Sequence, residues 1–153
     1  MIVAGVQLDI AWEDKKANFA KVRALLGAAK LPSGSLVFLP EMFATGFSLN
    51  AAAIAEPAGG ETESFLAGLA KERGLFIVGG MVAKASDGRG RNEAVAFGSD
   101  GAPAARYAKI HPFSFAGETD HYAPGADVVT FPWKGFRVAP FVCYDLRFPE
   151  VFR

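Results

Sequence analysis

Short apolar segments constrain the fold of this chain more than any other feature of its sequence. Three of them, residues 2–8, 35–39 and 75–82, have the length of buried strands and are too short for core helices. Each of the two gaps between them holds a stretch with apolar residues at helical spacing. Strands that alternate with helices predict an α/β architecture built from helical crossovers.

Two amphipathic stretches are expected to form those crossover helices. The first follows Asp14, a candidate N-cap, and the second spans 62–73 before Gly74, a candidate C-cap. The side chains expected to face the core are Phe19, Val22, Leu25, Leu26 and Ala29 in the first helix and Phe65, Leu66 and Leu69 in the second.

The second half of the chain has the pattern of β-hairpins. Two pairs of apolar segments are each separated by a short turn rich in Gly, Pro or Asp. Crossovers followed by hairpins predict an α/β protein with a mixed sheet and helices on one face. The expected strand–turn–strand segments are 93–97, 98–101 and 105–110, then 127–131, 132–135 and 136–142.

Composition excludes some classes of partner. Sixteen basic residues balance sixteen acidic ones, so no overall field attracts nucleic acid or an anionic membrane, and no segment is long enough to span a bilayer. The single cysteine excludes an intramolecular disulfide. The first residues are interrupted by Gln7 and Asp9, unlike a secretory signal. A soluble protein of the cytoplasm is expected.

That cysteine, Cys143, directly follows the apolar run 136–142, and Pro149-Glu150 is typical of a helix start. A thiol at a strand-to-helix turn meets the positive end of the helix, which favours the thiolate. A backbone N–H there can also face a developing oxyanion, as in a nucleophile elbow. The alternative interpretation is that Cys143 is a small buried hydrophobe.

Two further reactive side chains follow predicted strands. Glu41 comes directly after segment 35–39 and Pro40, and Lys109 lies at the end of segment 105–110. Alone, each is more typical of an ordinary loop or surface residue than of a catalytic one. Together with a thiol they supply what amide hydrolysis requires: a base, a cation for the oxyanion and a nucleophile.

The segments around these three residues resemble the nitrilase superfamily of carbon–nitrogen hydrolases. The resemblance implies that Glu41 is the general base, Lys109 the transition-state stabiliser and Cys143 the nucleophile. It also implies an α-β-β-α sandwich with a mixed sheet, formed when protomers pair as a homodimer or higher oligomer, and no metal or other cofactor. The matching segments are 39–43 with 45–47, 107–111 and 142–150, and also the N-terminal VAGVQLD with the helix after it.

Many members of the family have a second glutamate shortly after the lysine, which orients the lysine or the substrate. Glu118 occupies that place, with Asp120 as the nearby competitor, and an ordinary loop acid is the alternative for it. His111 and His121 are the only histidines, and neither is interpreted as catalytic or as part of a metal-ligand spacing.

The motifs EMFATGF and VCYDLRFPE are most similar to the ω-amidase branch of the family. That branch hydrolyses the terminal amide of 2-oxoglutaramate or 2-oxosuccinamate to the 2-oxo diacid and ammonia, through a cysteine thioester. Other branches, which are N-carbamoyl amidases, aliphatic amidases and nitrilases, share the same catalytic residues. A catalytically inactive binding protein on this scaffold is the alternative from a different class.

Such a substrate carries a carboxylate away from the scissile amide, so its pocket needs a cation or several N–H donors. Arg147 is the candidate cation, and a structural pair with Asp145 or Glu150 is its alternative.

The remaining substrate contacts are predicted from position. The backbone N–H of Tyr144 is expected to face the oxyanion. Phe43, Phe47 and Tyr122 are candidates for the pocket wall, although aromatic residues are more often plain core.

Family members continue well past the nucleophile motif. Residues 1–153 are therefore expected to be the N-terminal portion of a single carbon–nitrogen hydrolase domain.

Overall fold

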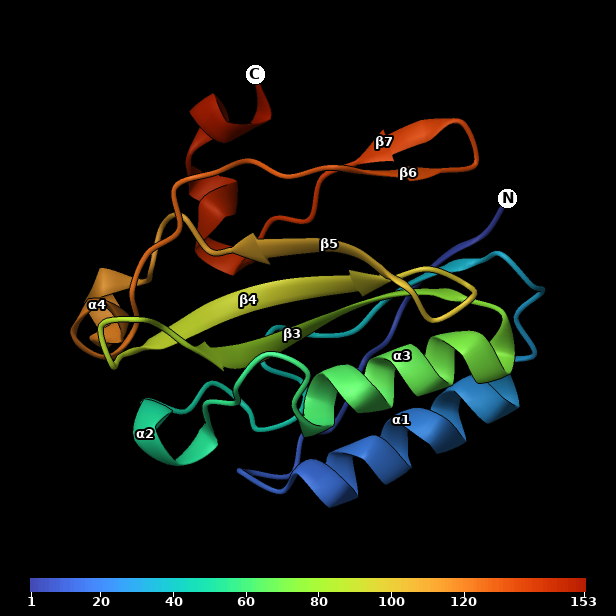
Figure 1. Cartoon of the computed structure of the whole chain (residues 1–153), viewed down its shortest axis with the longest axis horizontal. Helices are drawn as coiled ribbons and strands as arrows, with labels where there is room; N and C mark the ends of the chain where they lie inside the picture. The colour runs from blue at the N-terminus through green and yellow to red at the C-terminus, as the bar shows by residue number, and fades with distance from the viewer.

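Five strands form the central sheet, in the order β1-β2-β3-β4-β5, in the computed structural model, which describes residues 1–153 (Figure 1). β1, β2 and β3 run parallel to one another, whereas β3, β4 and β5 pair antiparallel. The sheet is therefore mixed, as the change from crossovers to hairpins predicted. The strands are β1 Val3–Gly5, β2 Leu36–Phe38, β3 Phe76–Lys84, β4 Gly90–Phe97 and β5 Pro103–Ala108.

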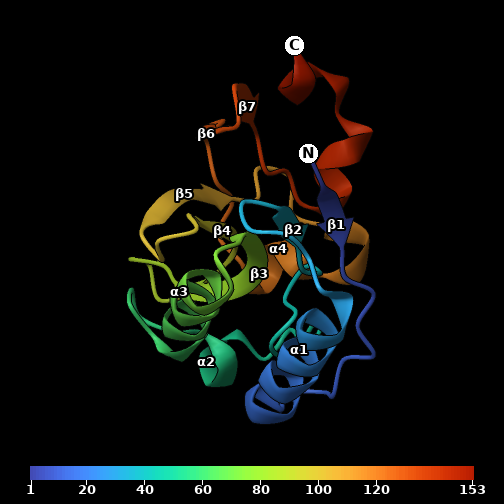
Figure 2. The same cartoon turned by 90° about the vertical axis from the view of Figure 1, so that its right-hand side faces the viewer.

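Two helices, α1 (Lys15–Ala29) and α3 (Glu61–Arg73), lie side by side on one face of this sheet (Figures 1 and 2). α1 begins where the carboxylate of Asp14 accepts a hydrogen bond from the backbone N of Ala17 at 2.9 Å. α3 ends at Gly74, which has a left-handed conformation with φ of 63°. Both predicted caps are confirmed, and a cluster of 17 buried hydrophobic residues fills the space between these helices and the sheet.

The inward face of α1 is narrower than predicted. Phe19, Val22 and Leu26 are buried, but Leu25 and Ala29 are exposed. The flank that carries Leu25 faces the edge of the sheet, where β1 has only three residues and covers little of the helix. The predicted burial of Leu25 and Ala29 was therefore wrong.

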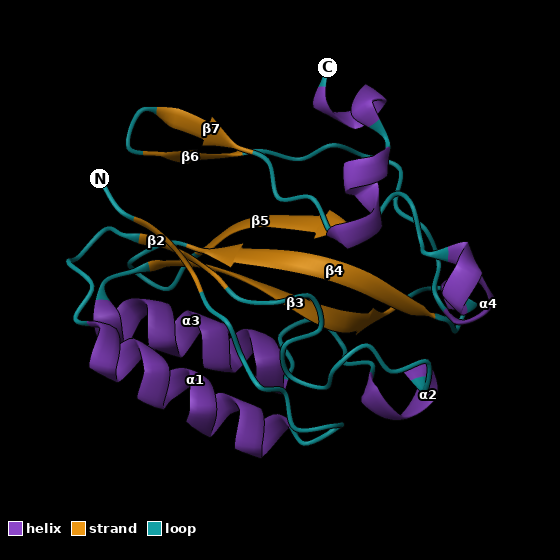
Figure 3. Cartoon of the chain, turned by 180° about the vertical axis from the view of Figure 1, so that it is seen from behind, coloured by secondary structure: helices purple, strands orange, loops and turns teal.

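The opposite face of the sheet is partly covered by a two-stranded hairpin and the C-terminal segment (Figure 3). The hairpin consists of β6 (Phe131–Trp133) and β7 (Phe136–Val138). Its turn contains only Lys134 and Gly135, both with positive φ, as the tight turns of twisted hairpins require. The predicted four-residue turn was thus too long, since Trp133 pairs with Phe136.

The predicted strand 136–142 ends early in the structure. Only β7 is a strand, and residues 139–142 continue as irregular extended chain to two 3-10 helices, η2 (Cys143–Arg147) and η3 (Pro149–Phe152). The apolar character of 139–142 comes from a different cause, because these residues line a cavity over the sheet. A strand buried on both faces was the wrong explanation for this run.

Strand boundaries near the other ends of the sheet also differ. The segment 2–8 forms only the three residues of β1, because it lies at the sheet edge with β2 as its one neighbour. β4 begins three residues earlier than expected, and β5 ends before Lys109. Three short helices in the connections were not predicted, because they have too few residues to show an apolar period. They are α2 Ala51–Ile54, η1 Ser114–Ala116 and α4 Glu118–His121. None of the helices combines the length and apolar character needed to cross a membrane.

Candidate active site

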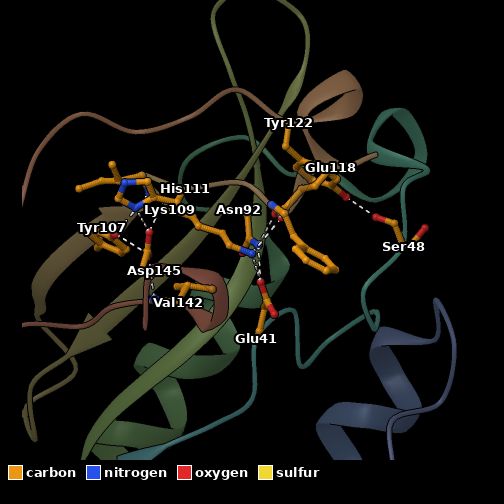
Figure 4. Close-up of polar contacts among 12 residues, drawn as sticks. Glu41, Ser48, Asn92, Tyr107, Lys109, His111, Glu118, Tyr122, Val142 and Asp145 are labelled. Carbon is orange, nitrogen blue, oxygen red and sulfur yellow. Dashed lines mark hydrogen bonds and ion pairs between the residues drawn. The ribbon is translucent and has the colours of Figure 1, made fainter. Parts of the chain in front are cut away.

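Glu41 lies on the turn that follows β2, at the carboxyl end of the parallel strands. Gly80 of β3 allows this turn to cross the strand, because a Cβ at Gly80 would lie 2.5 Å from the backbone N of Met42 and 2.7 Å from Cα of Glu41. Hydrogen bonds from Gly80 N to Pro40 O and from Phe43 N to Gly80 O hold the crossing in place. The carboxylate is thereby presented above the sheet face opposite α1 and α3 (Figure 4).

Lys109 follows β5 and is almost fully buried, with 1% of its side chain exposed. Its Nζ lies 2.8 Å from Oε1 of Glu41 and 2.9 Å from Oε2 of Glu118 (Figure 4). Burial alone favours the neutral amine, but hydrogen bonds to the two carboxylates and their negative charges outweigh it and raise the pKa of Lys109. Two of the three N–H groups of the ammonium are used, so one is left for a further acceptor.

Glu118 begins the short helix α4 and is fully buried. Besides Lys109, its Oε2 accepts a hydrogen bond from the backbone N of Phe113 at 2.5 Å. The structure therefore brings the lysine and both glutamates into one cluster, whereas Asp120, the competitor considered for Glu118, is exposed.

Asn92 of β4 belongs to the same cluster, and sequence reasoning missed it. Its Nδ2 lies 2.7 Å from Oε1 of Glu41 and 2.8 Å from Oε1 of Glu118 (Figure 4). The sequence signal that could have identified Asn92 is a polar residue on the same face of β4 as the buried Ala94 and Ala96. This signal is weak, because polar residues are common at the start of strands.

Cys143 stands at a sharp change of backbone direction. Val142 is extended, Cys143 has a φ of 46°, and η2 begins at the cysteine itself. A left-handed conformation at a residue other than glycine is strained, and such strain is typical of nucleophile elbows. The side chain is exposed and shares the lining of a cavity with Glu41.

The charges around Cys143 oppose one another. Partial burial raises the pKa of the thiol, and the negative charge of Glu41 raises it further, while the positive charge of Lys109 lowers it. The net effect is a raised pKa, which favours the thiol over the thiolate.

Asp145 ties the cysteine turn to the end of β5. Its buried carboxylate accepts hydrogen bonds from the Tyr107 hydroxyl at 2.6 Å, the backbone N of His111 at 2.9 Å and the backbone N of Val142 at 3.1 Å. Nδ1 of His111 lies 2.9 Å from the same carboxylate (Figure 4). The segment that carries Lys109 and the segment that carries Cys143 are therefore held together through one side chain.

A cavity of about 400 Å³ opens beside Glu41 and Cys143, on the sheet face opposite α1 and α3. Most of its lining is apolar, and the only ionisable groups in it are those two side chains. The other lining residues come from the ends of β2, from β3 and β4, and from the C-terminal segment: Phe38, Leu39, Val78, Gly80, Ala94, Ala139, Pro140, Phe141, Val142, Leu146 and Phe152.

The predicted aromatic wall residues lie in different places. The Phe47 ring centroid is 5.7 Å from Nζ of Lys109, so this ring belongs to the cluster. Tyr122 and Phe43 are fully buried, and the Tyr122 hydroxyl donates to the carbonyl of Ser48. Neither residue lines the cavity.

Tyr144 and Arg147 follow the cysteine on η2. Tyr144 is half-buried between Phe113 and Phe148, with ring centroids at 4.9 and 5.3 Å. Arg147 is exposed, outside the cavity lining, and pairs with neither Asp145 nor Glu150. The structure contains no group of three or more His, Cys, Asp or Glu side chains arranged to hold a metal ion.

Comparison with known proteins agrees with this architecture. Residues 2–153 match the carbon–nitrogen hydrolase family. The chain is 37% identical over 146 residues to an omega-amidase of Yersinia enterocolitica, covering 94% of this chain and 54% of the relative. It is 29% identical over 152 residues to a 2-oxoglutaramate amidase of Bacillus subtilis, covering 99% of this chain and 58% of the relative.

A solved structure gives the same result for the fold. The CN-hydrolase superfamily protein XC1258 of Xanthomonas campestris, which carries an arsenic adduct in its active site, superposes with a TM-score of 0.88 at 36% identity. The match covers 97% of this chain and 55% of that one. The chain thus spans about half the length of the relatives it matches. The predicted nitrilase-like α/β fold is confirmed, and the chain belongs to the carbon–nitrogen hydrolase family, the nitrilase superfamily.

Proposed function

We propose that the protein is a thiol-dependent amidase that hydrolyses the terminal amide of a small 2-oxo acid monoamide, with 2-oxoglutaramate and 2-oxosuccinamate as the candidate substrates. One observation carries the proposal: a carboxylate and a thiol, far apart in sequence, line one cavity, and a buried ammonium group is hydrogen-bonded to that carboxylate. The similarity to an omega-amidase and to a 2-oxoglutaramate amidase supports the choice of substrate.

In the first half of the proposed reaction, Glu41 accepts the proton of the Cys143 thiol as the sulfur attacks the amide carbon. The amide oxygen becomes an oxyanion, which the free N–H of Lys109 and the backbone N–H of Tyr144 stabilise. When the tetrahedral intermediate collapses, the C–N bond breaks, and protonated Glu41 gives its proton to the leaving nitrogen. The products are ammonia and a thioester on Cys143.

In the second half, the same carboxylate takes a proton from water, and the resulting hydroxide attacks the thioester carbon. The C–S bond breaks, the sulfur recovers its proton from Glu41, and the second carboxyl group of the product is formed. This carboxyl group then loses its proton to the ammonia released or to water. Glu118 holds Lys109 in position throughout, because it is buried and anchored by a backbone N–H of its own.

The distal carboxylate of the substrate requires a cation or several donors. Arg147 remains our candidate, since it is exposed and has no ion-pair partner. Phe47 is the proposed wall beside Lys109. Tyr122 is buried away from the cavity and is proposed to act through the loop that it anchors at Ser48. A pairing of protomers and a cytoplasmic location stay predictions.

Other branches of the family use the same three groups, so N-carbamoyl amidase, aliphatic amidase and nitrilase activities are the alternatives. Ammonia release from 2-oxoglutaramate, from an N-carbamoyl amine and from an aliphatic nitrile separates them directly. An inactive binding protein on this scaffold is the alternative outside catalysis. It is disfavoured by the intact set of Glu41, Lys109 and Cys143.

The test is ammonia release by the protein and by its Cys143→Ala variant. We expect turnover of 2-oxoglutaramate by the wild type and none by the variant, which lacks the atom that forms the thioester. The exposed position of Cys143 makes the change compatible with an intact fold, which circular dichroism checks. Unchanged turnover in the variant would refute the nucleophile assignment, and preference for a nitrile or carbamoyl amine would move the protein to another branch.

A further inference from the structure

Asn92 makes the one neutral link between the two carboxylates of the site. Its side chain is 1% exposed, and both hydrogen bonds from Nδ2 end on carboxylate oxygens, Oε1 of Glu41 and Oε1 of Glu118. These three residues come from β4, from the turn after β2 and from α4, so the amide joins three separate segments (Figure 4).

The chemistry of its neighbours determines the orientation of the amide. Carboxylate oxygens are acceptors, so the nitrogen must face Glu41 and Glu118, and the reverse orientation would place Oδ1 against both. Oδ1 is left buried with no hydrogen-bond partner. Against this one acceptor stand two charge-assisted hydrogen bonds from Nδ2, one to each carboxylate.

The two bonds have a consequence for the proposed base. Lys109 and Asn92 both contact Oε1 of Glu41, and neither contacts Oε2. Two donors on one oxygen prevent rotation of the carboxylate and leave the other oxygen to exchange protons. Without Asn92, only the ammonium would hold Glu41, and that group is shared with Glu118.

Asn92 also limits the charge of the cluster. The ionisable groups that face it are Glu41 from the turn after β2, Lys109 from the end of β5 and Glu118 from α4, with Cys143 beyond Glu41. Arg91 and Glu93 are its neighbours on β4, and their side chains belong to the other face of the strand. Two carboxylates, Glu41 and Glu118, therefore share one ammonium group, and the fourth member of the cluster, Asn92, is an uncharged donor.

We propose that Asn92 is a positioning residue: it orients Glu41 for proton transfer and keeps a third negative charge out of the cluster. This inference rests on the proposed amidase function. It deepens that function by naming a residue that acts through the base without touching the substrate.

Two substitutions test the two parts of the inference. Asn92→Asp keeps the shape of the side chain and adds a carboxylate. The added negative charge lets the cluster retain a proton to higher pH, so the acidic limb of the kcat/KM profile for 2-oxoglutaramate should move up by about one pH unit. Asn92→Leu removes both donors together with the unpaired acceptor. We expect kcat to fall about 10- to 100-fold with little change in KM, because the base is misplaced while the binding pocket is intact.

A purely structural role predicts different results. Asn92→Leu leaves Oε1 of the buried Glu118 without a donor, so thermal unfolding is measured to separate this loss of stability from the change in kcat. Asn50→Asp, at an exposed asparagine without a side-chain cap bond, is the matched control and should retain the wild-type pH profile. Wild-type kcat and an unmoved acidic limb in folded Asn92 variants would overturn the inference. So would a lower unfolding temperature combined with unchanged kcat.

A second readout keeps this inference separate from the proposed function. The added charge in Asn92→Asp should slow iodoacetamide labelling of Cys143 at pH 8, because it disfavours the thiolate. If the wild type hydrolyses no amide, the proposed function fails, but slower labelling of Asn92→Asp still supports the coupling. Equal labelling rates in the wild type and Asn92→Asp would overturn it.

Discussion

Cys143 illustrates how single residues are tuned in this site. Its backbone is held at a φ of 46°, and its thiol has a raised pKa because partial burial and the charge of Glu41 outweigh the charge of Lys109. A thiol that stays protonated until substrate arrives is less open to oxidation and alkylation than a permanent thiolate. Glu41, the proposed base, is then also the carboxylate that suppresses the reactivity of the thiol.

Glu41→Gln separates these two effects. Removal of the negative charge should lower the pKa of the Cys143 thiol, so iodoacetamide labelling at pH 8 should be faster than in the wild type, although turnover should be lost. Glu61→Gln, an exposed glutamate at the start of α3, is the matched control and should leave both rates unchanged. Slower labelling of Glu41→Gln would show that Glu41 assists the thiol even toward an alkylating reagent.

At the scale of elements, the site depends on how the end of β5 is joined to η2. β5 leads into Lys109, η2 begins with Cys143, and the two have no shared strand pairing. The junction is made by Asp145, a fully buried carboxylate with donors from Tyr107, His111 and Val142. Because charge-assisted bonds are stronger than neutral ones, one side chain suffices to hold both segments.

Asp145→Ala should therefore destabilise the protein by roughly 2 to 4 kcal/mol, since it leaves several buried donors without a partner. Turnover should fall as well, because Cys143 and Lys109 are no longer held at a fixed separation. Urea unfolding followed by fluorescence measures the first effect, and ammonia release the second. Asp127→Ala, at an exposed aspartate, should keep the wild-type midpoint; an equal midpoint in Asp145→Ala would contradict the role of the junction.

At the scale of the whole molecule, the two faces of the sheet differ. The helices α1 and α3 cover one face (Figure 1). An apolar core lies between them and the sheet, whereas the opposite face carries the polar cluster and the cavity. Three titratable side chains are buried outside the core that α1 and α3 cover: Tyr107, Lys109 and Tyr122. Each has a raised pKa, which favours its protonated form. For Tyr107 and Tyr122, burial is the main cause of the raised pKa, and nearby carboxylates raise it further. For Lys109, burial lowers the pKa, but the neighbouring carboxylates outweigh burial and raise it.

These shifts predict a loss of stability at high pH. A group whose pKa is higher in the folded than in the unfolded state stabilises the fold fully below the unfolded pKa, about 10 for Tyr and Lys. That contribution is lost as pH rises toward the folded pKa, so the urea midpoint should be constant near pH 8 and fall above about pH 10.

Two variants locate the source of that loss. Tyr107→Phe and Tyr122→Phe each remove one of the groups with a raised pKa, so each should make the decline above pH 10 shallower. A midpoint that stays constant up to pH 11 would contradict the prediction.

Several features that sequence reasoning predicted correctly have short-range causes. The Asp14 cap acts on Ala17 three residues away, Gly74 ends its own helix, and the 98–101 turn closes on neighbouring strands. The errors have causes outside the segment concerned. Leu25 is exposed because a sheet edge ends beside it. Residues 139–142 are apolar because they line a cavity, although they form no strand.

The sequence by itself determined the chemical groups of the site and their order along the chain, since Glu41, Lys109 and Cys143 stand in motifs that local patterns and family resemblance identify. Only the tertiary structure decided which other side chains join them. Asn92 and Glu41 are 51 residues apart and Lys109 and Glu41 are 68 apart, so their contacts depend on strand order and register. The physical reason is that hydrogen bonds and desolvation act over a few ångströms, and no local pattern encodes which distant segments come within that range.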